Sequence, residues 1–235
     1  MQYNPEPNKE KSQNQRDTPL DFEFGKIKHV RPPKKFESKI LVLDYLPEGK
    51  GFSQAPRKEP IILGIGTKWF SLLEVSLRKR GNYTKFAELK LPRPDEENGD
   101  TPLKRVIRQI STDELTNTAY EALDEAICLI IGKNEKRFVT FFNKAQPITN
   151  KLHALKLIPG IGKQLMWEIL EERKKLPFVS FKDIEDRVKV TDIAKMIQKR
   201  IRQELEGEEK HLLFTTKLEL DKKSEYRKRS REQKY

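Results

Sequence analysis

The stretch between residues 39 and 110 is built from short apolar runs separated by polar turns that contain glycine and proline. The runs are rich in Ile, Leu, Val and Phe and have the lengths of β-strands. They occupy residues 39–46, 60–66, 69–77, 85–91 and 101–110. Short strands at this close spacing predict a small antiparallel barrel or sheet, which the last run would close. Within the third run, strand alternation predicts that Trp69 and Phe70 face opposite sides.

From Ser111 onward the apolar positions recur every three or four residues, which is the period of an α-helix. Ser111 and Glu114 have the spacing of a capping box and predict the helix start, and Gly132 predicts its end. Its apolar face comprises Leu115, Ala119, Ala122, Leu123, Ala126, Ile127 and Ile130. A second helix carries core aromatics at helical spacing, namely Phe138, Phe141 and Phe142. We expect Cys128, beside this core, to be a buried and unreactive thiol.

The motif Pro159-Gly160-Ile161-Gly162 follows a short predicted helix, and a second helix is expected from Lys163. Two glycines around one aliphatic residue predict a tight turn with unusual backbone angles. The amides of the turn and of the following helix N-terminus point outward together and form an anion site, to which Lys163 adds positive charge. The pattern resembles the helix-hairpin-helix module, which binds a backbone phosphate without reading sequence. The alternative is a glycine-rich turn that only packs two helices.

A second helix pair is expected downstream of this turn. Ser180 and Asp183 give a cap signal for a short helix. The helix after it has an apolar face of Ile193, Ile197, Ile201 and Leu205, with Lys195, Lys199, Arg200 and Arg202 on its other faces. The turn between the two helices, Lys189-Val190-Thr191, contains no glycine. We therefore expect a tandem module in which the second unit braces the first and makes no strong phosphate contact.

The charge of the chain is concentrated in two separate blocks. The 235 residues include 48 Lys+Arg and 36 Asp+Glu, a net charge of +12. The net charge is +9 over residues 26–95, +4 over 151–206 and +3 over 207–235, and it is −2 over each of 1–25 and 96–150. Two basic blocks separated by an acidic one favour a polyanionic partner, with nucleic acid ahead of a ribosomal or membrane surface.

Composition argues against several classes of protein. No window approaches the ~18–20 uninterrupted apolar residues of a membrane span, and the first residues lack the apolar stretch of a signal peptide. We therefore expect a cytoplasmic protein without membrane attachment. The single cysteine, Cys128, excludes an internal disulfide and a cysteine-based zinc site. The three histidines, His29, His153 and His211, form no ligand pair, so we expect no metal.

No arrangement of side chains indicates catalysis. The glycine hairpin is similar to that of lyase-type DNA glycosylases, but their catalytic lysine corresponds to Gln164 and their catalytic aspartate to Lys182. Asp183, Glu185 and Asp186 lie too close together on one predicted helix to face a single site, which favours a solvated face. We expect no catalytic residue, no cofactor and no small-molecule substrate.

Several strings of the chain, taken together, resemble an archaeal family of unknown function. They are LVLDYLPEG, FSLLEV, DELTNTA, RFVTFFNKA and HALKLIPGIG, and the similarity spans about residues 38–205. The family is described as RNA-binding from its architecture, which pairs an OB-like barrel with a helix-hairpin-helix region. The resemblance implies an α+β fold, an OB-like β-barrel followed by helices, and an archaeal, cytoplasmic setting.

An OB-like barrel binds unpaired bases through a basic groove with aromatic stacking faces. The candidate binding residues of the barrel are Lys68, Trp69, Arg78, Lys79, Arg80 and Tyr83, and those of the glycine motif are Gly160, Ile161, Gly162 and Lys163. For each aromatic the alternative is a place in the core. For the Arg78-Lys79-Arg80 run the alternative is a solvated hairpin tip.

The chain is expected to fall into five segments: a disordered arm (1–25), an OB-like barrel (26–110), a helical connector (111–150), a helix-hairpin-helix module (151–206) and a basic, disordered tail (207–235). The expected function is non-catalytic binding of structured RNA or the ribosome. The barrel would supply most of the affinity and the hairpin one fixed phosphate contact. The alternatives are a DNA-binding accessory of repair or recombination and a protein-interaction module.

Overall fold

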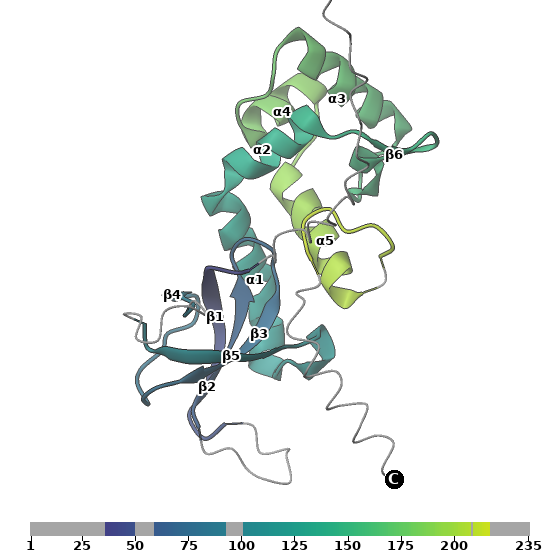
Figure 1. The fold of residues 1–235 in the computed structure, drawn as a ribbon. Coiled ribbons are helices and arrows are strands. Elements are labelled where there is room, and N and C mark those ends of the chain that lie inside the picture. Colours follow the sequence, from purple (N-terminus) through teal and green to yellow (C-terminus); the bar gives the residue numbers. More distant parts are fainter. Residues whose placement is uncertain (1–35, 50–58, 93–100, 208, 217–235) are drawn as a thin grey trace, which may run out of the picture. The chain divides into compact units, whose positions relative to one another are not determined.

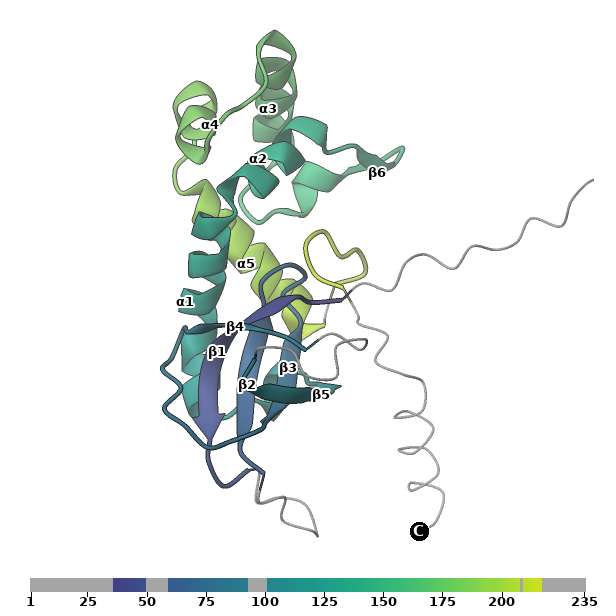
Figure 2. The same ribbon diagram turned by 60° about the vertical axis from the view of Figure 1, so that its left-hand side comes forward.

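Five antiparallel strands form one curled sheet (Figures 1 and 2). The computed structural model describes residues 36–49, 59–92, 101–207 and 209–216. The strands are β1 (Lys39–Leu46), β2 (Ile61–Gly66), β3 (Leu72–Leu77), β4 (Glu88–Lys90) and β5 (Leu103–Gln109). They lie in the order β4-β1-β2-β3-β5, and every neighbouring pair is antiparallel. The predicted antiparallel sheet is confirmed as a half-barrel. Within the described ranges no pairing joins β4 to β5, so the last strand extends the sheet and does not close it.

The central strands β2 and β3 are buried along their whole length, so the sheet is covered on both faces there. The strands β4 and β5 at its edges are partly exposed. Leu41 and Leu43 of β1 belong to the large core that the sheet shares with the helices. Ile40 and Val42, which point the other way, belong to a second core inside the curl. The register of β1 against β2 shifts between Val42 and Asp44, and such a bulge bends a strand. The curl thus lets one sheet cover one core and enclose another.

The segment that precedes β3 is a turn and not the expected strand. Trp69 lies in this turn, and Phe70 has a φ of +55°, in the left-handed region. The buried carboxylate of Glu37 accepts hydrogen bonds from the N–H groups of Lys68 (3.0 Å) and Trp69 (2.7 Å). The prediction that Trp69 and Phe70 face opposite sides of a strand is wrong, because this carboxylate satisfies the turn amides and β3 begins only after them.

The capping box begins a short 3-10 helix ahead of the first long helix. The elements here are η1 (Thr112–Glu114), α1 (Asn117–Lys133) and α2 (Glu135–Lys144). Ser111 and Glu114 form the predicted capping box around η1, whereas Thr116 caps α1. The prediction that Gly132 ends α1 is wrong. The side chain of Asn134 donates a hydrogen bond to a carbonyl of the last turn (2.8 Å) and supplies the C-cap instead.

The predicted apolar faces of these two helices are confirmed except at Leu115, which precedes α1, and Phe141; both are half-buried. α1 buries Ala119, Ala122, Leu123, Ala126, Ile127 and Ile130, and α2 buries Phe138 and Phe142. α1 packs against β1, β2 and α5. Cys128, by contrast, is exposed. The prediction of a buried thiol is wrong, because this residue lies on the side of α1 opposite the buried face.

Three further helices follow a small β-hairpin. The elements are β6 (Pro147–Thr149), β7 (Leu152–His153), η2 (Ala154–Leu157), α3 (Lys163–Lys175), α4 (Phe181–Val188) and α5 (Ile193–Glu206). The helix expected before the glycine turn is therefore only a four-residue 3-10 helix, whereas α3 begins at Lys163 as predicted. One continuous core joins the sheet to all of α1–α5. One common core therefore contains described residues from each of the three expected segments, 26–110, 111–150 and 151–206.

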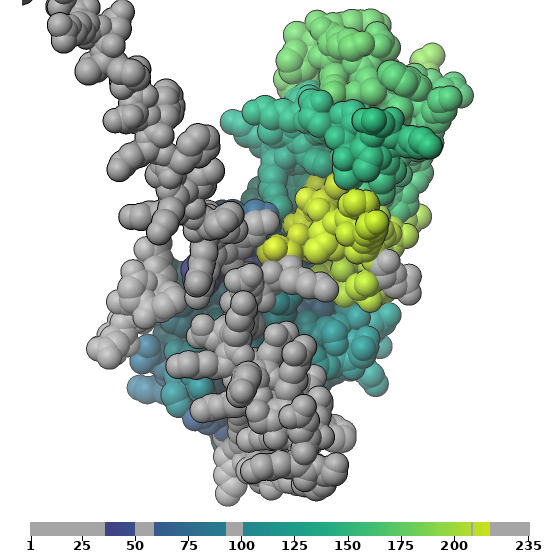
Figure 3. All heavy atoms as spheres, turned by 45° about the vertical axis from the view of Figure 1, so that its right-hand side comes forward, coloured from purple at the N-terminus to yellow at the C-terminus, as the bar shows by residue number. Residues whose placement is uncertain are grey.

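Residues 209–216, here called the C-terminal strap, fold back beside α5 (Figure 3). The buried carboxylate of Glu204 accepts hydrogen bonds from the N–H groups of residues 213–215 (2.8–3.1 Å). Phe214 is buried and packs edge-on against Phe138, with ring centroids 5.4 Å apart. The prediction of disorder from residue 207 is therefore wrong for the strap. The predicted disordered arm and the rest of the tail lie outside the described residues.

Candidate nucleic-acid interface

The glycine turn (residues 159–162) connects η2 to α3. The N–H of Ile161 donates a hydrogen bond to the carbonyl of Ile158 (3.0 Å), which closes the turn. Gly160 has a φ of +93°, in the region that favours glycine. The side chain of Ile161 is buried in the main core. The turn is therefore held by its own backbone and anchored by one apolar side chain.

The two glycines of the turn have different surroundings. A Cβ at Gly160 would lie 3.0 Å from the Cε atom of Met196, so the missing side chain lets α5 pack on the turn. A Cβ at Gly162 would meet no atom within 4 Å, and the φ of Gly162 is an ordinary −74°. Gly160 therefore serves the packing of the turn, whereas Gly162 leaves its side of the turn open.

The N-terminus of α3 carries no side-chain cap, because its N-cap residue is Gly162. The N–H groups of the first turn of an α-helix have no partner within the helix, and the helix dipole adds a partial positive charge there. Lys163 of this turn and Lys156 of η2 are both exposed. Neither forms an ion pair with another residue in the part of the chain that the structure describes. This end of α3 can therefore attract an anion and donate hydrogen bonds to it.

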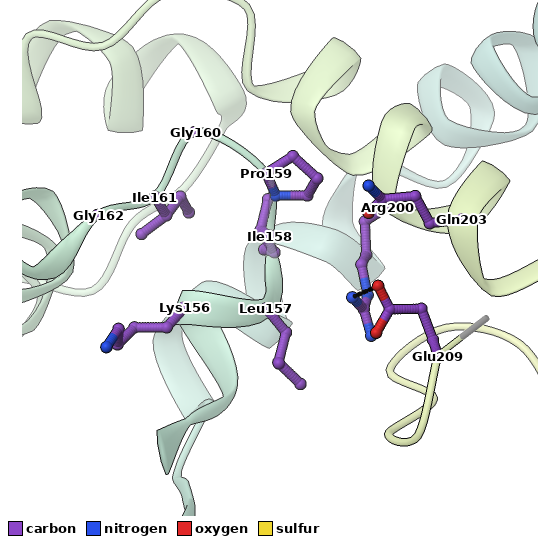
Figure 4. A pocket seen from close by; sticks show the side chains of 10 residues that line it. All are labelled: Lys156, Leu157, Ile158, Pro159, Gly160, Ile161, Gly162, Arg200, Gln203 and Glu209. Carbon is purple, nitrogen blue, oxygen red and sulfur yellow. Dashed lines mark ion pairs between the residues drawn. The ribbon is translucent and has the colours of Figure 1, made fainter. Parts of the chain in front are cut away.

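An open hollow with a volume of about 590 Å³ lies beside the glycine turn (Figure 4). The turn and Lys156 line one side of the hollow, and Arg200, Gln203 and Glu209 line the other. Lys156 and Gly162 border the same hollow although they belong to different elements. The hollow thus brings an exposed ammonium group and the uncapped start of α3 to one surface.

Arg200 contributes little free charge to this hollow. Its guanidinium is buried, forms ion pairs with Glu204 (3.0 Å) and Glu209 (2.8 Å), and donates a hydrogen bond to the carbonyl of His211 (2.6 Å). The prediction that Arg200 lies on an outer face of its helix is wrong, because two carboxylates and the strap compensate the buried cation. The uncompensated positive charge at the turn comes from the two lysines, Lys156 and Lys163.

The candidate residues of the sheet lie at opposite ends of β3. Lys68 and Trp69 precede this strand, and Arg78, Lys79 and Arg80 follow it. A six-residue strand separates its ends by about 20 Å at ~3.3 Å per residue. The structure therefore does not gather the sheet candidates into one groove.

Lys79 is the member of the basic run with the freest side chain. Arg78 donates a hydrogen bond to the carbonyl of Leu103 (3.3 Å), and Arg80 forms an ion pair with Glu48 (3.0 Å). In the described ranges Lys79 forms no ion pair, and it is exposed. The expectation of a hairpin tip is wrong, because β3 pairs with β2 and β5 and the run lies in the loop that leads to β4. This loop offers one cation that is not already engaged.

Tyr83 packs close to this run on the edge of the second core. Its hydroxyl donates a hydrogen bond to the carbonyl of Lys79 (3.4 Å), and its ring meets that of Tyr45 edge-on, with centroids 5.1 Å apart. Burial, with a smaller contribution from Tyr45, raises the pKa of Tyr83. The ring is half-buried, so one part packs while another remains accessible.

Lys68 and Trp69 form part of a packed corner. The Lys68 ammonium lies 5.3 Å from the centroid of the Trp69 ring, and the Arg137 guanidinium lies 5.7 Å from it. Arg137 also donates a hydrogen bond to the carbonyl of Lys68. Burial raises the pKa of Glu37, which holds this turn, although its hydrogen bonds with backbone amides act in the opposite direction. Two cations therefore already flank the Trp69 ring.

Two residues that sequence reasoning did not select adjoin the glycine turn. Lys156 borders the hollow, and Trp167 of α3 is 52% exposed. The apolar face of α3 contains Met166, Ile169 and Leu170, so helical spacing alone could have placed Trp167 outside that face. No comparable signal marked Lys156, because its proximity to the turn depends on the geometry of η2.

Metal-binding and membrane-spanning features are absent from the described ranges. No group of three or more His, Cys, Asp or Glu side chains in them is arranged to hold a metal ion. No helix in the same ranges is long and apolar enough to cross a membrane.

The chain is similar to a protein family and to two archaeal proteins. Residues 36–216 match the family model described as "Protein of unknown function (DUF655)". An uncharacterized protein of Methanocaldococcus jannaschii is 37% identical over 178 residues, which cover 76% of this chain and 78% of that protein. A crystal structure of a DUF655 protein from Archaeoglobus fulgidus has a TM-score of 0.68 and 38% identity, and the match covers 77% of this chain and 100% of that chain. The chain belongs to the DUF655 family of archaeal proteins of unknown function.

Proposed function

We propose that this protein is a non-catalytic nucleic-acid-binding protein that holds a backbone phosphate at the glycine turn. The observation that carries the proposal is the uncapped N-terminus of α3 behind the open Gly162, with the exposed Lys156 and Lys163 beside it. Free amides and a helix dipole at such an end favour a phosphate. Because these contacts address only the backbone, they hold the strand without selecting its sequence.

The arrangement of the helices supports a tandem helix-hairpin-helix in which only the first turn binds. The second turn, between α4 and α5, uses left-handed conformations at Lys189 (φ +50°) and Asp192 (φ +59°). The side chain of Asp192 caps α5 by accepting a hydrogen bond from the N–H of Lys195 (3.0 Å). This carboxylate occupies the place that a phosphate would take, so the second unit braces the first through Met196.

The segment of residues 26–95 is the second contact region in this proposal. It carries the largest positive excess of the chain, +9, although its described residues, 36–49 and 59–92, hold seven Lys and Arg against six Asp and Glu. In the loop after β3, Lys79 is exposed and forms no ion pair within the described ranges. An OB-like half-barrel with an exposed cation beside it suits a single strand or an RNA loop. The proposed ligand is therefore RNA ahead of DNA, with structured or ribosomal RNA as the class, in the cytoplasm of an archaeon.

The test is the salt dependence of binding by the full chain. The double variant Lys156→Gln, Lys163→Gln removes the two lysines at the turn. The matched control, Lys174→Gln with Lys175→Gln, removes two lysines at the C-terminal end of α3. These lysines form ion pairs with Glu171 (2.8 Å) and Glu172 (2.6 Å). We expect the first variant to reduce the log–log salt slope for an RNA hairpin by roughly 0.7–0.9 per lost phosphate contact, and the control to leave it unchanged.

Two results would contradict the proposal. The first is a wild-type chain that binds no RNA or DNA at physiological salt. The second is an equal slope for the wild type and the Lys156, Lys163 variant. Tighter binding to branched or single-stranded DNA than to RNA would replace RNA by DNA as the ligand and favour a role in repair or recombination.

A protein-interaction module is the second candidate, and one observation favours it. Leu176 and Val179, in the loop between α3 and α4, are 64% and 79% exposed. Exposed aliphatic side chains at one loop are a common feature of protein contacts. This alternative predicts weak binding to every nucleic acid and loss of a protein partner in the double variant Leu176→Ser, Val179→Ser.

A further inference from the structure

Trp167 is a large aromatic side chain that the fold leaves uncovered next to the glycine turn. It is 52% exposed, and it makes no ring–ring or cation–ring contact with any residue in the described ranges. Tyr120 is also exposed, but the guanidinium of Arg202 lies 4.3 Å from its ring centroid. A single exposed aromatic is unremarkable by itself, so its position decides what it can do.

The helix places this indole close to the proposed phosphate site. Trp167 lies four residues after Lys163, which is about 6 Å along the axis of α3 and on the same side of the helix. Side chains on an α-helix tilt toward its N-terminus. The side chain of Trp167 is therefore directed toward the first turn of α3, the turn whose amides are uncapped.

The charges along this side of α3 suit a strand that enters at the glycine turn. Lys163, one helical turn before Trp167, is exposed. One turn after Trp167, Glu171 forms an ion pair with Lys174 (2.8 Å), so the charge of this carboxylate is neutralised. Glu168 accepts a hydrogen bond from Gln164 (3.2 Å). The positive end of the helix and the uncovered ring are thus neighbours on one surface.

We propose that Trp167 is a base-stacking residue for single-stranded nucleic acid. An unpaired base lies on the indole while the phosphate of a neighbouring nucleotide lies at the glycine turn. The inference rests on the proposed function, because it takes that phosphate site as given. It narrows the ligand to strands with unpaired bases, since a base held within a duplex cannot present its face to the ring.

The test compares two ligands and three variants of the full chain. The ligands are a single-stranded oligouridine and an abasic oligonucleotide of the same length, which keeps the phosphates and lacks the bases. The variants are Trp167→Ala, Trp167→Phe and the control Leu176→Ala, which shortens another exposed apolar side chain at the end of the same helix. Circular dichroism checks that each variant is folded, as the exposure of both sites leads us to expect.

We expect Trp167→Ala to weaken binding to oligouridine by about fivefold to 150-fold, the range measured for one stacked base, and to leave binding to the abasic strand unchanged. Trp167→Phe should keep part of the affinity and Leu176→Ala all of it. Equal affinity of the wild type and Trp167→Ala for oligouridine overturns the inference, as does an equal loss for both ligands. A wild type that binds the RNA hairpin but neither single-stranded ligand overturns only the inference, whereas a wild type that also fails to bind the hairpin and DNA overturns the proposed function as well.

Discussion

The α-carbon of Gly160 lies against the thioether of Met196, so that a Cβ at this glycine would stand only 3.0 Å from the methyl carbon of that methionine. The same glycine has a φ of +93°. This contact joins the glycine turn to α5. The shape of the turn and the packing of the two helix pairs therefore depend on the same missing side chain.

Substitution of Gly160 by alanine should lower the free energy of unfolding by about 1–3 kcal/mol, because the new Cβ meets Met196 and the backbone stays left-handed. For a chain of this size each kcal/mol corresponds to about 2–4 °C in Tm. Gly162→Ala is the matched control and should cost at most about 1 kcal/mol, since its Cβ points into open space. Thermal unfolding of both variants provides the measurement, and equal losses would refute the distinction between the two glycines.

The buried carboxylate of Glu204 should be far more important for stability than a surface carboxylate on the same helix. Glu204→Ala leaves Arg200 without one of its partners and removes the acceptor for the amides of the strap. We expect a loss of about 3–5 kcal/mol and faster proteolysis of the strap. Glu206→Ala breaks an exposed pair with Arg202 (2.9 Å) and should cost less than about 1 kcal/mol. Urea unfolding measures both, and similar midpoints would contradict this account.

The η2 segment should loosen at mildly acidic pH because of His153. Burial, with the nearby Arg173, lowers the pKa of His153 below its ordinary value of 6.5. Its Nδ1 atom accepts a hydrogen bond from the N–H of Leu155 (3.1 Å), which protonation would remove. Since the folded chain favours the neutral ring, this contribution to stability is complete above pH 6.5 and is lost as the pH falls through the lowered pKa.

The matched variant for this prediction is His153→Asn, whose side-chain oxygen can accept the same bond without titrating. When the pH falls from about 7.5 to about 5, the unfolding free energy of the wild type should fall by more than that of the variant. Denaturant unfolding at both pH values checks it. If the difference in unfolding free energy between the two proteins does not depend on pH, protonation of His153 does not destabilise the folded chain between these two pH values.

In the loop after β3, Lys79 should contribute more to nucleic-acid binding than Arg80. The side chain of Arg80 is already paired with Glu48 (3.0 Å), whereas Lys79 is exposed and forms no ion pair within the described ranges. Lys79→Gln should therefore reduce the log–log salt slope for RNA by roughly 0.7–0.9, and Arg80→Gln by less. Fluorescence anisotropy at several salt concentrations measures both slopes. If Arg80→Gln has the larger effect, the ion pair does not restrain that side chain.

Local patterns predicted the parts of the fold that depend on local causes. The apolar period placed the buried face of α1, and the two glycines placed the start of α3 at Lys163. The same patterns failed where a distant group decides the conformation. Phe70 adopts its left-handed turn because Glu37, more than thirty residues earlier, supplies the acceptors. Pairing of β4 with β1 is likewise a long-range choice that no local signal specifies.

The candidate site shows the same division. The turn itself was recognisable from Gly160 and Gly162, because its geometry needs those residues. The burial of Arg200 could not be foreseen, since its partners Glu209 and His211 lie beyond the end of its helix. The separation of Lys68 from Arg78 follows from the length of β3 once that strand is known to start at Leu72.

The central claim, that a phosphate binds at the start of α3, is tested most directly by amide chemical shifts. A ¹⁵N–¹H spectrum of the full chain is recorded while a short single-stranded RNA is added. The account predicts that the largest shifts belong to the amides of Gly162, Lys163, Gln164 and Leu165, with smaller shifts at the α4–α5 turn, whose amides are capped by Asp192. Binding of the RNA with no shift at the start of α3 would contradict it.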